Sequence, residues 1–289
     1  MKMQALLASI ALAVGGLSGS AALADGFEIA FFAASAQNGF NQAIYEGIQA
    51  KAKELGVETA IYDGSFDAAK QYSQIEDVLA GNQFDAFIVV PNDTVGIAGA
   101  VEQVGEKGKP LVTALFPIGP DLTNLEPQVK GVTTTVANPP AVGAKAQAEK
   151  VVDFCKEKNP CNVVILIGQK IYPFDNLRYE TYLATLKGHD NIKVVATGEG
   201  NYDPDKSLTV MQDILQANKD VNVVLSNADQ HLVGAEIALQ NAGYNVPDLF
   251  LSGGGAASIA IEAIREGRWD NTLAYYPVTM GSKALRLVR

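Results

Sequence analysis

Cysteine, histidine and basic residues are scarce in this chain, and each shortage argues against a class of site. The 289 residues include only two cysteines and two histidines, and His189 and His231 lie near neither each other nor the cysteines. A metal site built from these side chains is therefore not expected. Lysine and arginine number 22 against 32 aspartates and glutamates, a formal net charge of −10. Because an acidic surface repels nucleic acid and anionic lipid, we expect neither as a partner.

Long apolar segments and the common catalytic motifs are also missing from most of the chain. After residue 24, no stretch is long and apolar enough to cross a membrane. The first predicted strand-to-helix turn lacks the G-x-G-x-x-G pattern of dinucleotide-binding folds. No Ser-His-Asp set is evident either. We therefore expect no cofactor and no enzymatic activity.

The first 24 residues have the pattern of a cleavable signal peptide. Lys2 supplies a positive charge, residues 5–14 form a short apolar core, and residues 22–24 read Ala-Leu-Ala, an A-x-A cleavage signal. The apolar core is too short to span a bilayer, and no cysteine near the cleavage point could carry a lipid anchor. The sequence therefore predicts export to the periplasm, with the mature chain beginning near Asp25. The alternative is a buried first helix of a cytoplasmic protein.

The two cysteines, Cys155 and Cys161, flank the pentapeptide Lys-Glu-Lys-Asn-Pro. In an exported protein, such a pair predicts a local disulfide that joins the end of a helix to the next strand. The alternative is two free thiols.

Short apolar or β-branched segments alternate with segments of helical period along the mature sequence. Strands are expected at residues 27–33, 57–62, 86–90, 111–115, 129–136, 163–167, 192–196, 221–225 and 249–251, and helices near 41–55, 72–79, 97–104, 141–154, 177–186, 208–215, 232–242 and 259–265. Continuous apolar strands that alternate with helices indicate parallel sheets covered on both faces. Two successive sets of similar size predict an α/β protein with two Rossmann-like lobes. Their boundary falls near residues 134–140, where Pro139-Pro140 breaks regular structure.

Polar and aromatic residues gather where the predicted strands end. In parallel sheets, ligands bind outside the carboxyl ends of the strands. Amides and carboxylates bond hydroxyl groups, and aromatic rings cover the C–H faces of small polar ligands. The segments concerned are 35–41, 91–94, 169–178, 201–203, 227–229 and 252–255. Asp93, Asp203 and Asp229 could instead be ordinary helix N-caps. The glycines at 253–255 lack the lysine of a P-loop and predict a tight turn.

In their order and spacing, several segments resemble the periplasmic sugar-binding proteins of ABC importers, in the ribose-binding cluster of type 1. They are Gln37-Asn38-Gly39-Phe40, Lys53-Glu54-Leu55-Gly56, residues 88–93, Lys109-Pro110-Leu111-Val112, Tyr202-Asp203 leading to Val210-Met211-Gln212, and Ser226-Asn227-Ala228-Asp229 before Gly234-Ala235. The resemblance covers essentially the whole mature chain. It implies a periplasmic binding protein type 1 architecture, with one lobe from residues 25–135 plus 275–289 and the other from 138–272. Three crossing segments would join lobes that close over a ligand.

The resemblance also implies a function. The chain would bind a small hydroxylated ligand, such as a sugar, polyol or furanose-like compound, and deliver it to ABC permease subunits in the inner membrane. A chemoreceptor is compatible as a further partner. The ligand-binding residues implied by position, or standing at departures from the family pattern, are Asn38, Phe40, Phe116, Arg178, Tyr202, Asn227, Asp229 and Tyr275.

The departures from ribose binders predict the character of the pocket. Leu115-Phe116 stand where those proteins carry an aspartate-arginine pair, a glycine near 255 replaces an aspartate, and Tyr275 replaces a glutamine. Losing these charged groups makes the pocket less polar and more aromatic. We expect an uncharged ligand between the rings of Phe40, Phe116 and Tyr202, with Arg178 as the main charged donor. Alternatively, Arg178 pairs with Asp175 and does not contact the ligand.

Family members continue for roughly thirty residues past the position of Gly281, so a chain ending at Arg289 is expected to be a fragment or to lack the third crossing segment. A Rossmann-like exported enzyme acting on a small carbohydrate is the alternative function. A two-lobed transcription regulator would need a basic helix-turn-helix where this chain has its predicted signal peptide.

Overall fold

The computed structural model describes residues 26–289, so the predicted signal peptide over residues 1–24 lies outside the described residues. Over residues 26–289, none of the helices combines the length and the apolar character that a membrane crossing requires.

The first half of the chain builds one parallel sheet flanked by helices. Its elements are β1 (Glu28–Ala33), α1 (Gly39–Leu55), β2 (Glu58–Asp63), α2 (Ala68–Gly81), β3 (Ala86–Val89), α3 (Ala98–Glu106), β4 (Leu111–Leu115) and β5 (Val132–Ala137). The sheet has five strands in the order β2-β1-β3-β4-β5, and every pairing is parallel. These elements, together with α9 described below, are called the N-terminal lobe.

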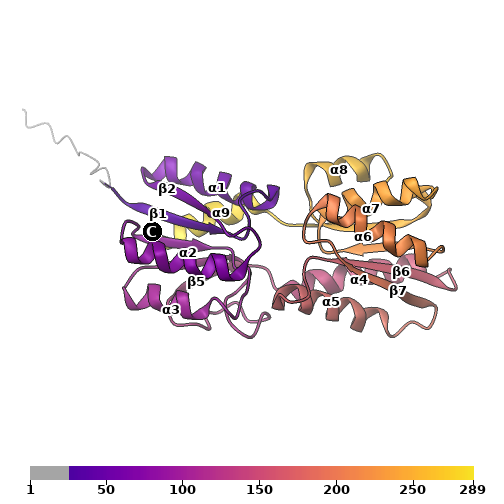
Figure 1. Ribbon diagram of the computed structural model, residues 1–289, viewed down its shortest axis with the longest axis horizontal. Helices are drawn as coiled ribbons and strands as arrows, with labels where there is room; N and C mark the ends of the chain where they lie inside the picture. Colours follow the sequence, from indigo (N-terminus) through magenta and orange to yellow (C-terminus); the bar gives the residue numbers. More distant parts are fainter. Residues whose placement is uncertain (1–25) are drawn as a thin grey trace, which may run out of the picture.

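The second half repeats the arrangement with its own sheet. Its elements are α4 (Pro140–Cys155), β6 (Cys161–Ile167), α5 (Pro173–Leu186), β7 (Ile192–Glu199), α6 (Pro204–Ala217), β8 (Val223–Ser226), α7 (Asp229–Asn241), the 3-10 turn η1 (Val246–Asp248), β9 (Phe250–Gly255), α8 (Ser258–Arg265) and β10 (Asn271–Ala274). The five strands are parallel in the order β10-β9-β8-β6-β7. We call this the C-terminal lobe. Figure 1 shows the two lobes side by side.

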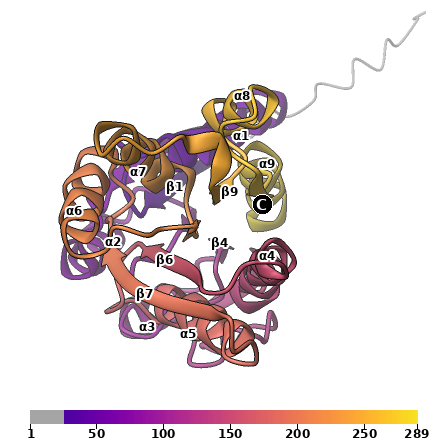
Figure 2. The ribbon, with the colours of Figure 1, turned by 90° about the vertical axis from the view of Figure 1, so that its right-hand side faces the viewer.

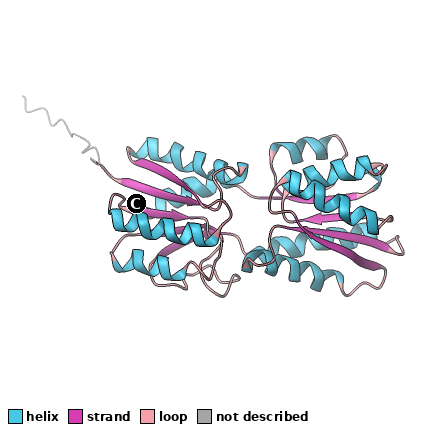
Figure 3. Cartoon of the chain, viewed as in Figure 1, coloured by secondary structure: helices cyan, strands magenta, loops and turns pink. Residues whose placement is uncertain are grey.

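Each sheet is buried between two layers of helices, as Figure 3 shows. In the N-terminal lobe, successive residues of β1 face opposite sides because side chains alternate along a strand. Ile29 and Phe31 pack with α1 and α9, whereas Ala30 and Phe32 pack with α2 and α3. In the C-terminal lobe, α6, α7 and α8 cover one face and α4 and α5 the other (Figure 2). The predicted parallel α/β fold with two sheets is confirmed.

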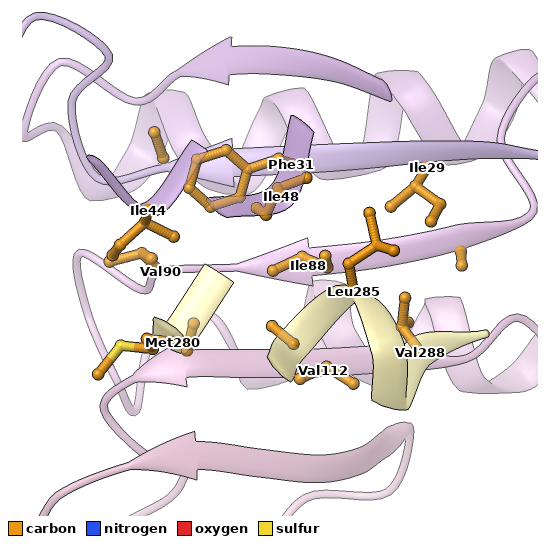
Figure 4. Close-up of a cluster of buried hydrophobic side chains, with 14 of the residues drawn as sticks. Ile29, Phe31, Ile44, Ile48, Ile88, Val90, Val112, Met280, Leu285 and Val288 are labelled. Carbon is orange, nitrogen blue, oxygen red and sulfur yellow. The ribbon is translucent and has the colours of Figure 1, made fainter. Parts of the chain in front are cut away.

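Helix α9 (Pro277–Val288) returns from the C-terminal lobe to the N-terminal lobe. Its Met280, Leu285 and Val288 enter the core beside Ile44 and Ile48 of α1, as Figure 4 shows. The two helices pack closely at glycines: a Cβ atom at Gly281 would overlap the carbonyl oxygen of Ile44. The end of the described chain is therefore part of the N-terminal core.

Replacing Gly281 with alanine is therefore expected to lower the free energy of unfolding by about 1–3 kcal/mol, because the added methyl group meets backbone that has no room to move. Urea denaturation measures this loss. Gly188→Ala is the matched control, since a Cβ atom there meets nothing within 4 Å. Equal stability of the two variants would contradict the close packing of α1 and α9.

The sequence prediction was wrong in three places. The strand expected over residues 129–136 begins only at Val132, because a turn precedes it with Gly131 at φ 105°. Strand β10 was not predicted, since its four residues form a half-exposed edge strand without an apolar pattern. The glycines 253–255 form the end of β9 rather than a tight turn. A Cβ atom at Gly254 would lie 2.6 Å from the carbonyl oxygen of Asn227.

Cys155 at the end of α4 and Cys161 at the start of β6 are joined, which confirms the predicted disulfide. Reducing it is expected to lower the free energy of unfolding by about 2 kcal/mol in the chain-entropy model, because the closed loop is short. Denaturation with and without reductant measures the change, and the double variant Cys155→Ala/Cys161→Ala should not respond to reductant. Titration of two free thiols in native, unreduced protein would contradict the disulfide.

Candidate functional site

A cavity lies between the lobes, where loops at the carboxyl ends of both sheets meet, and its empty space is about 570 Å³ when the part open to solvent is included. Seven of the eight predicted ligand residues line it: Asn38, Phe40, Phe116, Arg178, Tyr202, Asn227 and Tyr275. Both lobes therefore contribute to one partly open cavity.

Asp229, the eighth predicted residue, does not line the cavity. Its Oδ2 accepts a hydrogen bond from the backbone N–H of Ala257 at 2.9 Å, and its Oδ1 accepts one from Thr272 Oγ1 at 2.7 Å. Burial raises the pKa of Asp229, and these hydrogen bonds oppose that rise. Its carboxylate therefore holds the segment directly after β9, next to the cavity-lining residues Gly254 and Gly255.

Phe66 and Gln230 also line the cavity, although both lie outside the strand-end segments that the sequence indicated. Phe66 follows β2 and Gln230 lies in the first turn of α7. The rule that ligands bind beyond the carboxyl ends of strands could have found Phe66, had it been applied to β2 as well. Phe174 also lines the cavity, and lies within the polar and aromatic segment 169–178.

Asn38 starts α1 as its N-cap. Its side-chain oxygen accepts hydrogen bonds from the backbone N–H groups of Phe40 (3.0 Å) and Asn41 (3.3 Å). The cap occupies that oxygen, so the amide nitrogen is the group that Asn38 can offer a ligand. The cap also fixes the direction in which Phe40 leaves the loop.

Arg178 and Asp175 form a buried ion pair at the cavity wall. Both come from α5, whose helical spacing places residues three apart on one face. Arg178 Nη1 lies 3.3 Å from Asp175 Oδ1, and the exposed fractions of the two side chains are 6% and 0%. The other carboxylate oxygen accepts from the backbone N–H of Gln169 at 2.8 Å. Arg178 therefore pairs with Asp175 and also lines the cavity, so the ion pair does not remove Arg178 from the cavity wall.

Tyr202 and Asn227 complete the network around Asp175. The Tyr202 hydroxyl donates to Asp175 Oδ1 and accepts from Arg178 Nη1 at 3.4 Å. Asn227 Nδ2 donates to Asp175 Oδ1 at 2.8 Å and to the Tyr202 hydroxyl at 3.1 Å. Because a carboxylate only accepts, the Asn227 amide is oriented with its nitrogen toward Asp175. Asn227 Oδ1 has no hydrogen-bond partner among the described residues.

Burial shifts the pKa values of the titratable side chains in this network. Burial raises the pKa of Asp175, and the Arg178 guanidinium together with hydrogen bonds from Tyr202, Gln169 and Asn227 opposes the rise. Burial also raises the pKa of the Tyr202 hydroxyl well above its ordinary value. The tyrosine is therefore a neutral donor at physiological pH.

The loop that carries Tyr202 is held by a buried histidine. Asn201 and Tyr202 both have left-handed backbones, with φ of 52° and 57°. Such a conformation costs about 1–3 kcal/mol per residue and needs support from its surroundings. The Tyr202 N–H donates to His231 Nε2 at 2.9 Å, and His231 Nδ1 lies 2.8 Å from Ser226 Oγ. Since Nε2 accepts, the proton of the neutral ring is on Nδ1 and is donated to Ser226.

This histidine should make stability depend on pH. Burial lowers the pKa of His231 to about 3 from the ordinary 6.5, with a smaller effect from Arg178. Between these pH values the unfolded chain binds a proton that the folded chain excludes, so the free energy of unfolding falls as the pH falls. The loss from this residue should be about 2 kcal/mol between pH 7 and pH 5.

The His231→Gln variant should lose less stability over the same range, because glutamine does not titrate. Urea denaturation at both pH values compares the two proteins. His189→Gln serves as control, since His189 is exposed. Identical pH dependence in wild type and His231→Gln would contradict a neutral, buried imidazole.

Aromatic rings form most of the remaining wall. Phe40 and Tyr275 meet edge to face with centroids 5.9 Å apart, and Phe66 stacks on Tyr202 at 5.4 Å. The guanidinium carbon of Arg178 lies 4.9 Å from the centroid of the Phe116 ring. Such rings cover C–H groups of a ligand without competing for its hydroxyls.

Of the three aspartates that could instead have been helix caps, Asp93 and Asp203 are caps, whereas Asp229 is not. Asp203 is the N-cap of α6, and its Oδ1 accepts from the backbone N–H of Lys206 at 2.7 Å. Asp93 caps the turn before α3, where its Oδ1 accepts from the backbone N–H groups of Val95 and Gly96 at 2.9 Å.

Of the described residues that line the cavity, Arg178 alone carries a full charge and none is a carboxylate. Within residues 26–289, no group of three or more histidine, cysteine or acidic side chains could hold a metal ion. The cavity therefore offers a small molecule one guanidinium, side-chain amides and aromatic faces.

The sequence and the fold of this chain are similar to those of known proteins. The ribose import binding protein of Bacillus subtilis is 26% identical over 266 residues, covering 89% of this chain and 79% of that protein. The D-apiose import binding protein of Actinobacillus succinogenes is 27% identical, covering 91% and 83%. The structure of the Caulobacter myo-inositol binding protein superposes with a TM-score of 0.80 at 24% identity, covering 91% and 86%.

A family model described as a periplasmic binding protein domain matches residues 29–289, which includes both sheets and the loops that form the cavity. This chain therefore belongs to the periplasmic binding protein family.

Proposed function

We propose that this protein is the solute-binding component of an ABC importer. It binds a small, uncharged, hydroxylated ligand, such as a sugar, polyol or furanose-like compound, and delivers it to permease subunits in the inner membrane. The observation that carries the proposal is the interlobe cavity, which combines aromatic walls with one guanidinium and side-chain amides. Relatives named for ribose, D-apiose and myo-inositol support the ligand class.

The preference for an uncharged ligand follows from the charge balance at Arg178. Asp175 already offsets the guanidinium, so an anionic ligand would bring an uncompensated charge into a desolvated site. Asn227 Oδ1 is an acceptor without a partner among the described residues, and a buried acceptor of this kind favours a donor. A hydroxyl group can accept from Arg178 and donate to an amide oxygen, whereas a carboxylate or phosphate only accepts.

Closure of two lobes is part of the proposal. Residues 25–135 with 275–289 act as one lobe, and residues 138–272 act as the other. Asn38 and Phe40 contact the ligand from the first, Arg178, Tyr202 and Asn227 contact it from the second, and Asp229 supports the wall. Since neither lobe alone supplies both sets of contacts, binding favours the closed arrangement. Export by the predicted signal peptide places the protein in the periplasm, where a chemoreceptor could be a second partner.

A thermal-shift screen tests the proposal. The protein is unfolded, stripped of small molecules, refolded with its disulfide intact, and heated with D-ribose, D-apiose, myo-inositol, ribose 5-phosphate or glutamate. At 100 times its Kd, a ligand stabilises the fold by about 2.7 kcal/mol, which raises Tm by several degrees in a protein of this size. We expect stabilisation by at least one neutral compound. Stabilisation by the charged compounds alone would overturn the proposed ligand class, and turnover of a bound carbohydrate would favour an enzyme.

A further inference from the structure

The lobes contact each other directly through aromatic side chains. Phe116 of the N-terminal lobe stacks on Phe174 of the C-terminal lobe, with centroids 4.1 Å apart and planes 12° apart. Tyr172 also stacks on Phe174, with centroids 5.7 Å apart, and Leu122 packs with them from the N-terminal lobe. All four side chains are buried, with exposed fractions of 4–7%.

A second direct contact lies beside this stack. The Tyr172 hydroxyl donates to the backbone carbonyl oxygen of Phe66, across the lobes, at 2.6 Å. The Phe66 ring in turn stacks on Tyr202 of the C-terminal lobe. The same C-terminal segment, around α5, therefore contacts two loops of the N-terminal lobe.

The loops that make these contacts have strained backbones. Phe66, Leu115 and Tyr202 all have left-handed conformations, with φ of 52°, 72° and 57°. Leu115 directly precedes Phe116. Left-handed backbones at residues other than glycine are costly and persist where surrounding contacts hold them. Here each strained residue is part of, or adjacent to, an aromatic contact between lobes.

These contacts involve protein atoms alone, so their contribution to closure does not depend on a ligand. Separating the lobes would expose the facing rings to water, which is unfavourable for apolar surface. Stacked aromatic pairs add a further favourable contribution beyond the burial of area. The stack also forms part of the cavity wall, since Phe116 and Phe174 both line it.

We propose that Phe174 is the C-terminal half of an interlobe latch, with Phe116 as its N-terminal half, which holds a substantial fraction of the protein closed before ligand binds. This inference rests on the proposed function in one respect, that the two lobes open and close. Phe174 then influences ligand affinity because it sets the population of the closed form. The apparent affinity for a ligand falls when the binding-competent form of the protein is rare.

Distance measurements between spin labels on the ligand-free protein test the latch. Cysteines introduced at the exposed residues Lys107 and Lys187, near the ends of α3 and α5, place one label on each lobe. The native cysteines are joined in a disulfide, so only the introduced thiols react. Wild type should show a substantial short-distance population. Phe174→Ala should reduce the ratio of closed to open protein by about tenfold or more, because the whole stack is lost.

Phe154→Ala is the matched control, since Phe154 pairs with Phe250 within the C-terminal lobe at 5.1 Å. It should leave the distances unchanged. Tyr172→Phe removes only the hydrogen bond to Phe66 and should open the cleft less than Phe174→Ala. Far-UV circular dichroism checks that each variant is folded. A wild type that is wholly open, or identical distances in wild type and Phe174→Ala, would overturn the latch while leaving the thermal-shift result intact.

Discussion

Replacing Arg178 with alanine should weaken ligand binding by about ten- to a hundredfold, which corresponds to losing a charged hydrogen-bond donor worth about 1.5–3 kcal/mol. Arg178 lines the cavity and is oriented by Asp175 and the Tyr202 hydroxyl, so its guanidinium is preorganised for a ligand oxygen. Its fixed fork can hold two adjacent oxygens, and no other described residue of the cavity carries a guanidinium. Titration calorimetry with the strongest compound of the thermal-shift screen measures the effect.

Arg178→Lys is the control for charge. Lysine keeps the positive charge but lacks the planar fork, so it should recover only part of the affinity. Both variants are compared by circular dichroism, because alanine also leaves Asp175 without its cationic partner. An unchanged Kd for a folded Arg178→Ala protein would mean that Arg178 serves Asp175 alone.

Replacing Asp175 with alanine should lower the free energy of unfolding by about 3–5 kcal/mol, the largest effect expected for a single residue of this site. The change leaves the Arg178 guanidinium buried without a counter-charge. It also removes the acceptor for the backbone N–H of Gln169 and for Asn227 Nδ2. Urea denaturation at pH 7 measures the loss.

The matched control is Asp153→Ala, at another aspartate paired with a cation three residues further along its chain. The Asp153–Lys156 pair spans 2.9 Å, but both side chains are more than half exposed. Exposed pairs contribute about 0–1 kcal/mol, so this variant should be nearly as stable as wild type. If Asp175→Ala lost no more stability than Asp153→Ala, the buried network would not be an organising feature of the C-terminal lobe.

The fold could be predicted from sequence because its signals are local. Strands such as β4 and β6 are continuous apolar segments, and the helices between them have a clear apolar face, so their order implies two parallel sheets. Strand β10 escaped because an edge strand of four half-exposed residues carries no such pattern. The glycines 253–255 were wrongly predicted to form a tight turn. They are glycines because the loop after β8 passes too close to leave room for a side chain, and that loop is distant in sequence.

The candidate site was predictable residue by residue but not as a network. The rule for strand ends located Asn38, Arg178, Tyr202 and Asn227, because each lies in a loop or helix start after a strand. The role of Asp175 depends on three donors that come from separate loops, and nothing in its own segment indicates them. The role of His231 could not be predicted either, because its hydrogen bond to Tyr202 spans 29 positions of the chain.

Electron density for a bound ligand would test the central claim most directly. The protein is crystallised with the neutral compound that stabilises it most in the thermal-shift screen. Density for that compound should fill the cavity between Phe40 and Tyr202, with a hydroxyl within hydrogen-bond distance of both Arg178 and Asn227. Density outside the cavity, or a ligand in the cavity that makes no contact with Arg178, would contradict the account.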